Sequence, residues 1–184
     1  MVATVDILTV GYVGERVAGT VSLIRDEHVI AVVDPGMVSS RWTILDPLAE
    51  HGVTPEDVTD VIISHHHPDH TWHIALFPNI RLHDYWATYE RDMWTSRPAE
   101  GYELSDSIRL LETPGHTRED ITTMVETEAG TLAMTHLWWN ANSAGDPRAF
   151  DVDQLNHHRG RVLKEATIII PGHGAAFPAF NAPV

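Results

Sequence analysis

The sequence of 184 residues contains no cysteine. Disulfide bonds and thiolate zinc sites are therefore excluded, and the absence fits a reducing compartment. No apolar run approaches the ~18 residues that a membrane-spanning helix needs. Residues 1–6 lack the basic and apolar regions of a secretory signal. We therefore expect a cytoplasmic protein that does not engage a membrane.

Positive charge is also scarce, because 12 Lys and Arg residues stand against 26 Asp and Glu residues, for a net charge of -14. A surface that binds nucleic acid usually carries a basic stripe, and the sequence has no cluster of Lys and Arg. The composition therefore disfavours nucleic acid as a partner and leaves a small-molecule substrate. The length suits one compact domain, which we expect to span residues 1–184.

Histidine, in contrast, is concentrated where it could bind metal. The apolar segment 58–63 is followed by Ser-His-His-His-Pro-Asp-His, which supplies four candidate ligands: His65, His67, Asp69 and His70. His116 and His173 lie in the glycine turns Thr-Pro-Gly-His-Thr and Pro-Gly-His-Gly, each after a predicted strand. Glycine lets the backbone turn sharply there, so that all these side chains can meet at one sheet edge. The alternative is a solvated cluster without function, which the two remote histidines argue against.

The predicted elements alternate between strands and helices, but the strand-rich front half does not suit an open parallel sheet. Two sheets with helices outside fit the pattern better, which is an α+β arrangement. The His-x-His-x-Asp-His motif at residues 65–70 and the two later histidines resemble those of the metallo-β-lactamase superfamily. Together with Leu-Phe-Pro at residues 76–78, they resemble a small single-domain subgroup of it. This resemblance covers nearly the whole chain and implies a four-layer αββα sandwich, with metal at one edge of its two sheets.

The resemblance also implies roles for the candidate ligands. One ion would be held by three histidines: His65, His67 and His116. A second would be held by Asp69, His70 and His173, and zinc is the expected metal, with one or two ions per chain. Asp34 matches the carboxylate that orients ligand histidines in the family. The alternative for Asp34 is a residue that only forms the Asp-Pro-Gly turn.

His136 marks a departure from the family pattern. The family usually has an aspartate here that bridges two ions, whereas this chain reads Met-Thr-His-Leu-Trp at residues 134–138. A neutral imidazole has one free lone pair and cannot bridge. We therefore expect weaker binding of a second ion, a more electropositive site that favours an anionic substrate, or both. The alternative is that His136 is no ligand and only caps a strand end.

The chemistry implied is hydrolysis, in which a metal lowers the pKa of bound water toward ~7 and supplies hydroxide. Asp69 is the candidate catalytic residue, which orients the nucleophile or carries a proton to the leaving group. We expect a small ester, thioester, lactone or related substrate. Three alternatives stay open: a mononuclear iron oxygenase, an RNA or phosphodiester hydrolase, and a metal-binding protein with reduced catalysis. Iron or manganese is the alternative metal.

The six tryptophans are many for this length. Trp72, Trp138 and Trp139 follow candidate ligands in the sequence, and they are candidates for the wall of a substrate pocket. Trp86 and Trp94 recur at helical spacing with nearby aromatic residues. For these two we expect core packing or a contact within a homodimer.

Overall fold

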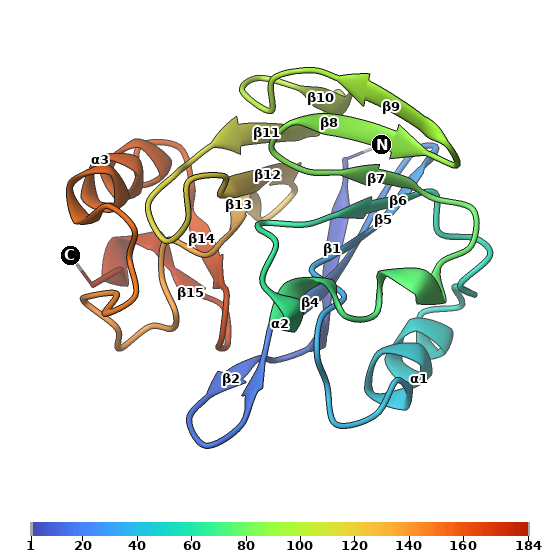
Figure 1. The fold of residues 1–184 in the computed structure, drawn as a ribbon, viewed down its shortest axis with the longest axis horizontal. Coiled ribbons are helices and arrows are strands. Elements are labelled where there is room, and N and C mark those ends of the chain that lie inside the picture. Colours follow the sequence, from blue (N-terminus) through green and yellow to red (C-terminus); the bar gives the residue numbers. More distant parts are fainter. Residues whose placement is uncertain (1, 184) are drawn as a thin grey trace.

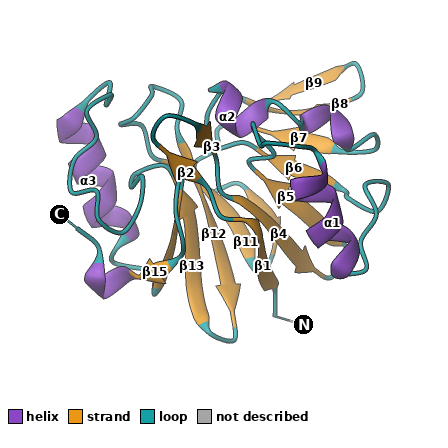
Figure 2. Cartoon of the chain, turned by 90° about the horizontal axis from the view of Figure 1, so that it is seen from below, coloured by secondary structure: helices purple, strands orange, loops and turns teal. Residues whose placement is uncertain are grey.

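The computed structural model describes residues 2–183, and two β-sheets packed face to face form its centre (Figure 2). Within these residues the first sheet has the strand order β1-β4-β5-β6-β7-β8-β9. The bounds of its strands are Thr4–Thr9 (β1), Val21–Asp26 (β4), Val29–Val33 (β5), Asp60–Ile62 (β6), Arg81–His83 (β7), Ala87–Glu90 (β8) and Met93–Ser96 (β9).

The second sheet has the order β10-β11-β12-β13-β14-β15, and a short hairpin of β2 and β3 stands apart from both sheets. The bounds of these strands are Glu103–Ser105 (β10), Ile108–Glu112 (β11), Ile121–Thr127 (β12), Gly130–Thr135 (β13), Ile168–Pro171 (β14), Phe177–Pro178 (β15), Tyr12–Val13 (β2) and Val17–Ala18 (β3).

Helices cover the outer faces of the two sheets (Figure 1). Helices α1 and α2 lie against the first sheet, and α3 lies against the second. Their bounds are Trp42–Glu50 (α1), Pro68–Thr71 (α2) and Val152–Val162 (α3), with short 3-10 turns at Ile74–Leu76 (η1) and Ala179–Asn181 (η2). No helix within the described residues is both long and apolar enough to span a bilayer.

Strand alternation explains the layers. Successive side chains of a strand point to opposite faces, so an apolar strand between two layers feeds two cores. In β4, Leu23 packs into the core under α1, which contains Ile44 and Leu48. Its neighbour Ile24 faces the second sheet and packs in the core between the sheets, which includes Leu110.

The second sheet is arranged in the same way. Val125 of β12 faces the core between the sheets, whereas Met124 packs against Leu155 and Val162 of α3. Three apolar cores thus separate four layers, and the expected αββα sandwich is confirmed. Each buried aliphatic side chain contributes about 1.5–3 kcal/mol to these cores.

The aromatic segment after β7 differs from the expectation. The spacing of Trp86 and Trp94 suggested a helix, but β8 and β9 form an antiparallel hairpin at the edge of the first sheet. Trp86 is 46% exposed, and Trp94, on the outermost strand, is 62% exposed. Core packing is therefore wrong for these side chains, because an edge strand has a neighbour on one side only.

Candidate metal centre

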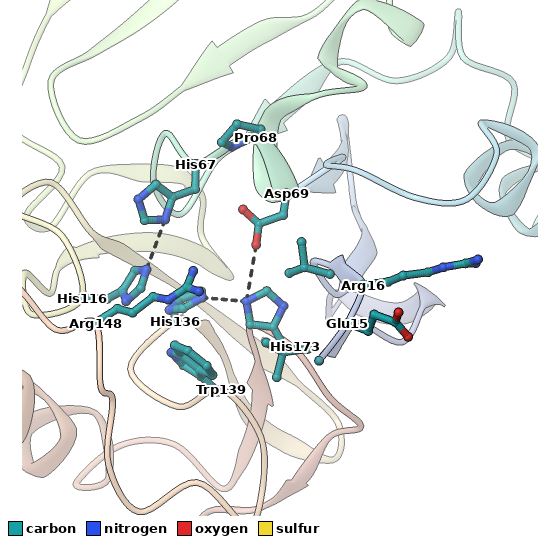
Figure 3. Close-up of a pocket in the computed structure, with 13 residues that line it drawn as sticks. Glu15, Arg16, His67, Pro68, Asp69, His116, His136, Trp139, Arg148 and His173 are labelled. Carbon is teal, nitrogen blue, oxygen red and sulfur yellow. Dashed lines mark hydrogen bonds and ion pairs between the residues drawn. The ribbon is translucent and has the colours of Figure 1, made fainter.

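The candidate ligands lie in segments that follow strand ends of both sheets. His65 and His67 are in the loop between β6 and α2, and Asp69 and His70 are in α2. His116 lies in the turn after β11. His136 and His173 follow β13 and β14, whose parallel register pairs Thr135 with Pro171. The structure thus brings all seven proposed ligands to one edge of the sandwich. Figure 3 shows five of them, His67, Asp69, His116, His136 and His173.

Three histidines form one tight group. Nδ1 of His67 lies 2.9 Å from Nε2 of His65 and 3.2 Å from Nε2 of His116. The rings of His65 and His67 meet edge to face, with their centroids 4.5 Å apart. The nitrogen atoms of the three rings thus lie within hydrogen-bonding distance of one another, with Nδ1 of His67 between the other two.

A second group forms around Asp69. Its Oδ2 atom lies 3.6 Å from Nε2 of His70 and 3.5 Å from Nε2 of His173. His136 stands between the two groups, with its Nε2 atom 3.0 Å from Nε2 of His173. The ligand atoms of His65, His116 and His136 lie within 4.8 Å of one another, and so do those of His70, His136 and His173.

Hydrogen bonds on the far side of three rings fix their tautomers. Nδ1 of His70 donates to Asp34 at 2.9 Å, Nδ1 of His116 donates to Asp146 at 2.7 Å, and Nδ1 of His173 donates to the Ala18 carbonyl at 2.9 Å. A neutral imidazole carries one proton, so in each ring the proton sits on Nδ1. The lone pair of each Nε2 therefore points into the site.

His65 is oriented through Ser64. The Ser64 hydroxyl donates to Oδ2 of Asp34 at 2.7 Å and lies 3.0 Å from Nδ1 of His65. Because the hydroxyl has one proton, its oxygen accepts from His65. The Asp34 carboxylate thus holds two histidines, one directly and one through Ser64. Asp34 also accepts from the backbone N–H of Ser64 at 2.6 Å, with its own φ at 53°, in the left-handed region.

Burial keeps most of these rings neutral. Removal from water lowers the pKa of His65 and of His136 well below the ordinary value, and the charge of His70 adds to this effect. Burial also acts to lower the pKa of His70, but the charge and hydrogen bond of Asp34 outweigh it and raise that pKa. Neutral rings offer lone pairs at neutral pH, as metal ligands must.

Two glycines allow the close packing behind the ligands. A Cβ atom on Gly36 would overlap the carbonyl of Asp69, and one on Gly172 would lie 2.5 Å from Cδ2 of His136. A larger residue at either position would displace the backbone or ring that presents a ligand. The Asp-Pro-Gly and Pro-Gly-His turns in the sequence therefore serve close approach as well as chain reversal.

The donor set suits a divalent cation. Within residues 2–183, the buried atoms Nε2 of His70 and Nδ1 of His136 have no hydrogen-bond partner. A buried nitrogen without a partner costs about 1–3 kcal/mol, a cost that a bound cation at Nε2 of His70 would remove. Imidazole nitrogens with one carboxylate oxygen are the ligands that zinc and similar transition metals take.

The site opens into a cavity of about 310 Å³. Trp139 and Arg148 line it beside the histidines, and the β2–β3 hairpin contributes Val13 and Arg16. In Figure 3 the Arg148 side chain extends toward the histidines, whereas Arg16 points away from them. Five of the proposed ligands line the cavity: His67, Asp69, His116, His136 and His173.

The tryptophans expected to line a pocket are separated by the structure. Trp139 lines the cavity, but Trp72 is 68% exposed and lies outside the lining. Trp138 is fully buried and donates from Nε1 to the Pro183 carbonyl at 2.8 Å. The expectation was wrong for Trp72 and Trp138. Trp138 packs in the core under α3, away from the cavity that its neighbour Trp139 lines.

The sequence reasoning missed two buried carboxylates. Asp146 orients His116, as described above, but it lies 30 positions further along the chain, and no local motif announces it. Asp120 lies 4.0 Å from Nδ1 of His65 and accepts from the N–H and hydroxyl of Thr117. Burial raises the pKa of Asp120 to about 6, against these hydrogen bonds. The Thr-x-x-Asp spacing beside His116 was the available signal for Asp120.

Residues 14–176 match the family model described as the metallo-beta-lactamase superfamily. The chain belongs to this superfamily. Members of the metallo-beta-lactamase superfamily bind metal ions, and the histidine groups described above could hold one. The superfamily includes hydrolases.

Among curated relatives, metallo-beta-lactamase domain-containing protein 1 of Xenopus laevis is 33% identical over 168 residues, which are 86% of this chain and 72% of the relative. Its mouse counterpart is 31% identical over 79% of this chain, which spans only 60% of the mouse protein.

Solved metallo-beta-lactamase structures share the fold. A putative metallo-beta-lactamase from Thermotoga maritima superposes with a TM-score of 0.78 at 20% identity, over 97% of this chain and all of that one. An N-acyl homoserine lactone hydrolase, with its product N-hexanoyl-L-homoserine at its catalytic metal centre, gives a TM-score of 0.68 at 20% identity, over 93% and 92% of the two chains.

Proposed function

We propose that this protein is a metal-dependent hydrolase of a small ester, thioester, lactone or related substrate, with zinc as its metal. The observation that carries the proposal is the orientation of four histidines, His65, His70, His116 and His173. Each directs the lone pair of Nε2 toward the other candidate ligands because its other nitrogen donates elsewhere. His116 and His173 also line the cavity, whereas His65 and His70 are buried and do not. Lone pairs that face one another repel, and a bound cation turns this arrangement into a stable one.

We assign one ion to His65, His67 and His116, and a second to Asp69, His70 and His173. Ligand atoms around a tetrahedral zinc at ~2.0–2.1 Å lie about 3.3 Å from one another. The contacts of 2.9 Å and 3.2 Å in the first group, and of 3.5 Å and 3.6 Å in the second, lie on either side of that value. Both groups are therefore near the size that a cation requires.

His136 makes the two ions unequal. Its ring is within reach of both groups, but a neutral imidazole supplies one lone pair and so binds one ion. An aspartate in its place would bring a negative charge and two oxygens. With Asp69 as the single carboxylate among the proposed ligands, two divalent cations are poorly neutralised. We propose that one ion binds tightly and that the second binds more weakly.

A divalent cation supplies two things to hydrolysis: a water ligand with a pKa near ~7, and polarisation of the scissile carbonyl. The residues of this chain do the rest. Asp69 reaches over the cavity, where its carboxylate can take a proton from the attacking water and deliver it to the leaving group. Asp34 and Asp146 hold the imidazoles in place, and Trp139 forms an apolar wall for the substrate.

The test is metal content together with hydrolysis. Untagged protein should hold zinc by elemental analysis and should hydrolyse N-hexanoyl homoserine lactone or a short acyl thioester. His116→Ala should lose both, whereas His28→Gln, on the exposed turn between β4 and β5, should keep both. The proposal would be refuted if the parent protein binds no metal, or if the His116→Ala variant hydrolyses the substrate as well as the parent does. Iron in the isolated protein with oxygen uptake on a thiol would indicate an oxygenase instead.

His136→Asp examines the unusual ligand. We expect the variant to bind a second ion more tightly than the parent, as measured by metal stoichiometry during titration. Hydrolysis that falls in the variant means that His136 takes part in the parent's chemistry. Activity that appears from a silent parent means that the parent is a metal-binding protein with reduced catalysis.

A further inference from the structure

Two arginines of the described residues line the histidine cavity, Arg16 and Arg148, and Arg148 is the one directed toward the histidines (Figure 3). It lies on the cavity wall, and in Figure 3 its guanidinium is directed toward the histidines. Arg16 also lines the cavity but points outward from the β2–β3 hairpin. Arginine and lysine are few in this acidic chain, which has a net charge of -14, so the position of Arg148 beside the proposed metal site is a feature to explain.

Trp139 is the aromatic ring that the Arg148 guanidinium contacts. The centre of the Arg148 guanidinium is 6.0 Å from the centroid of the Trp139 ring. The same ring is 6.4 Å from the rings of His116 and His136, and 6.0 Å from that of His173. A cation near an aromatic ring is stabilised by about 0.5–1 kcal/mol at an exposed site. The Trp139 ring thus lies near both the Arg148 guanidinium and the rings of three proposed ligands.

Asp146 couples this arginine to the proposed metal site. Its Oδ2 atom accepts from Nδ1 of His116 at 2.7 Å, and its Oδ1 atom accepts from the backbone N–H of Arg148 at 2.8 Å. The Asp146 carboxylate therefore orients the ring of a proposed ligand and also holds the backbone that carries Arg148. The preceding loop is anchored as well, because the buried Arg159 donates to the carbonyls of Leu137 and Ala144.

The Arg148 guanidinium is free of carboxylate partners within the part of the chain that the structure describes. Within residues 2–183, no carboxylate forms an ion pair with Arg148. Asp146, two positions away, is engaged with a backbone N–H and with His116. Arginine presents a planar set of donors that matches a carboxylate. An arginine held in this way, with its donors directed into a substrate cavity, is arranged to bind an anion that arrives with the substrate.

We propose that Arg148 binds a carboxylate of the substrate, and that this carboxylate is separate from the group that is hydrolysed. The proposal rests on the proposed function and narrows it: the substrate is a small ester, thioester or lactone that also carries a free carboxylate. Hydrolysis then yields a product with two anionic ends, one at the metal and one at Arg148. The net charge of the chain repels large polyanions, so the recognition is confined to a small anion.

The experiment compares dicarboxylates with monocarboxylates on zinc-loaded protein by calorimetric titration. The probes run from succinate to pimelate, each paired with the monocarboxylate of the same carbon number, such as glutarate with valerate for one chain length. At least one dicarboxylate should bind about tenfold more tightly than its partner, the effect of one hydrogen bond between charged groups. Raised salt should reduce this preference.

Three variants assign the preference to Arg148. Arg148→Gln should reduce the ratio to about one, and Arg148→Lys should keep part of it, because lysine retains the charge but not the planar donors. Arg118→Gln is the matched control: it removes the same charge next to the site, from an exposed arginine that lies 4.3 Å from the Phe150 ring and outside the cavity lining. Its ratio should equal that of the parent.

A ratio near one in the parent, or a preference that survives in Arg148→Gln, would overturn the anion site. Zinc content and hydrolysis of a neutral lactone are measured on the same samples after titration, which also reveals any metal removed by the probe. If zinc and neutral-lactone hydrolysis are retained while the preference is absent, the anion site alone is wrong. If both are missing, the proposed function fails.

Discussion

The Nδ1 atom of His70 lies 2.9 Å from Oδ2 of Asp34, a carboxylate 36 positions earlier in the chain. Asp34 adopts a positive φ at the end of β5, where it also accepts both donors of Ser64. A strained backbone of this kind persists only where surrounding contacts hold it. The strain at Asp34 is therefore balanced by three hydrogen bonds that organise the ligand loop.

Asp34→Asn should weaken metal binding 10–100-fold, the usual effect of losing the partner of a ligand histidine. An amide has one oxygen, so its NH2 group would face a donor on Ser64 or His70. Competition with a chelator measures the affinity. Asp26→Asn is the control, since it alters a buried carboxylate at the end of β4, where Ser105 donates to it. Equal affinities in both variants would contradict this role for Asp34.

Asp146→Asn should have a comparable effect on the other proposed ion, because His116 would lose the acceptor that fixes its tautomer. Burial acts to raise the pKa of Asp146, but hydrogen bonds from His116 and from the Arg148 backbone lower it overall. Asp146 is therefore ionised at neutral pH and pairs with the ring N–H. The measurement is metal stoichiometry across a chelator series, and an unchanged profile would argue against the assignment.

Gly36→Ala should prevent metal binding and destabilise the protein, because its Cβ would overlap the Asp69 carbonyl and push the ligand loop outward. Gly160→Ala provides the contrast. Gly160 lies inside α3. Apart from its chain neighbours and the backbone of its own helix, no atom of the described residues comes within 4 Å of the place that its Cβ would occupy. Alanine there should stabilise the protein by about 0.5–1 kcal/mol. Urea denaturation of both variants measures whether stability falls in Gly36→Ala and rises in Gly160→Ala.

The stability of the metal-free protein should fall as the pH is lowered from about 7.5 to 5.5. Burial lowers the pKa of His65, His67, His136 and His173, so below an unfolded pKa of about 6.5 the unfolded chain binds more protons than the folded one. Each such ring costs up to ~1.4 kcal/mol per pH unit. His70, whose pKa is raised, acts in the opposite direction.

Urea midpoints at the two pH values measure this effect. His65→Gln removes one titrating ring and should flatten the pH dependence. A midpoint that rises on acidification would contradict the prediction and would mean that the raised pKa values of His70 and Asp120 dominate the balance. Zinc should protect against the loss until protons displace it from the ligands.

Local sequence carried much of the prediction. The motif at residues 65–70 places four candidate ligands within six residues. Recognition of so short a motif requires no knowledge of the tertiary structure. The apolar pattern of strands such as β4 and β5 likewise predicts side chains that are buried on both faces, and hence two packed sheets with outer helices. The inference of two packed sheets with outer helices is confirmed, because strand patterns depend on neighbours in the chain. The roles of the four ligands stay a prediction.

Tertiary structure alone decided the features that depend on partners distant in sequence. Asp146 reaches His116 across 30 positions, and Trp138 and Trp139 are adjacent in sequence, yet one packs in the core and the other lines the cavity. The hairpin of β8 and β9 likewise overrode the helical spacing of Trp86 and Trp94, because pairing with β7 satisfies the backbone there. The sequence by itself determined which residue types could bind a cation and roughly where they stand. The packing of two sheets determined which of them face one another, because hydrogen-bond partners and ring directions are set by contacts between distant segments.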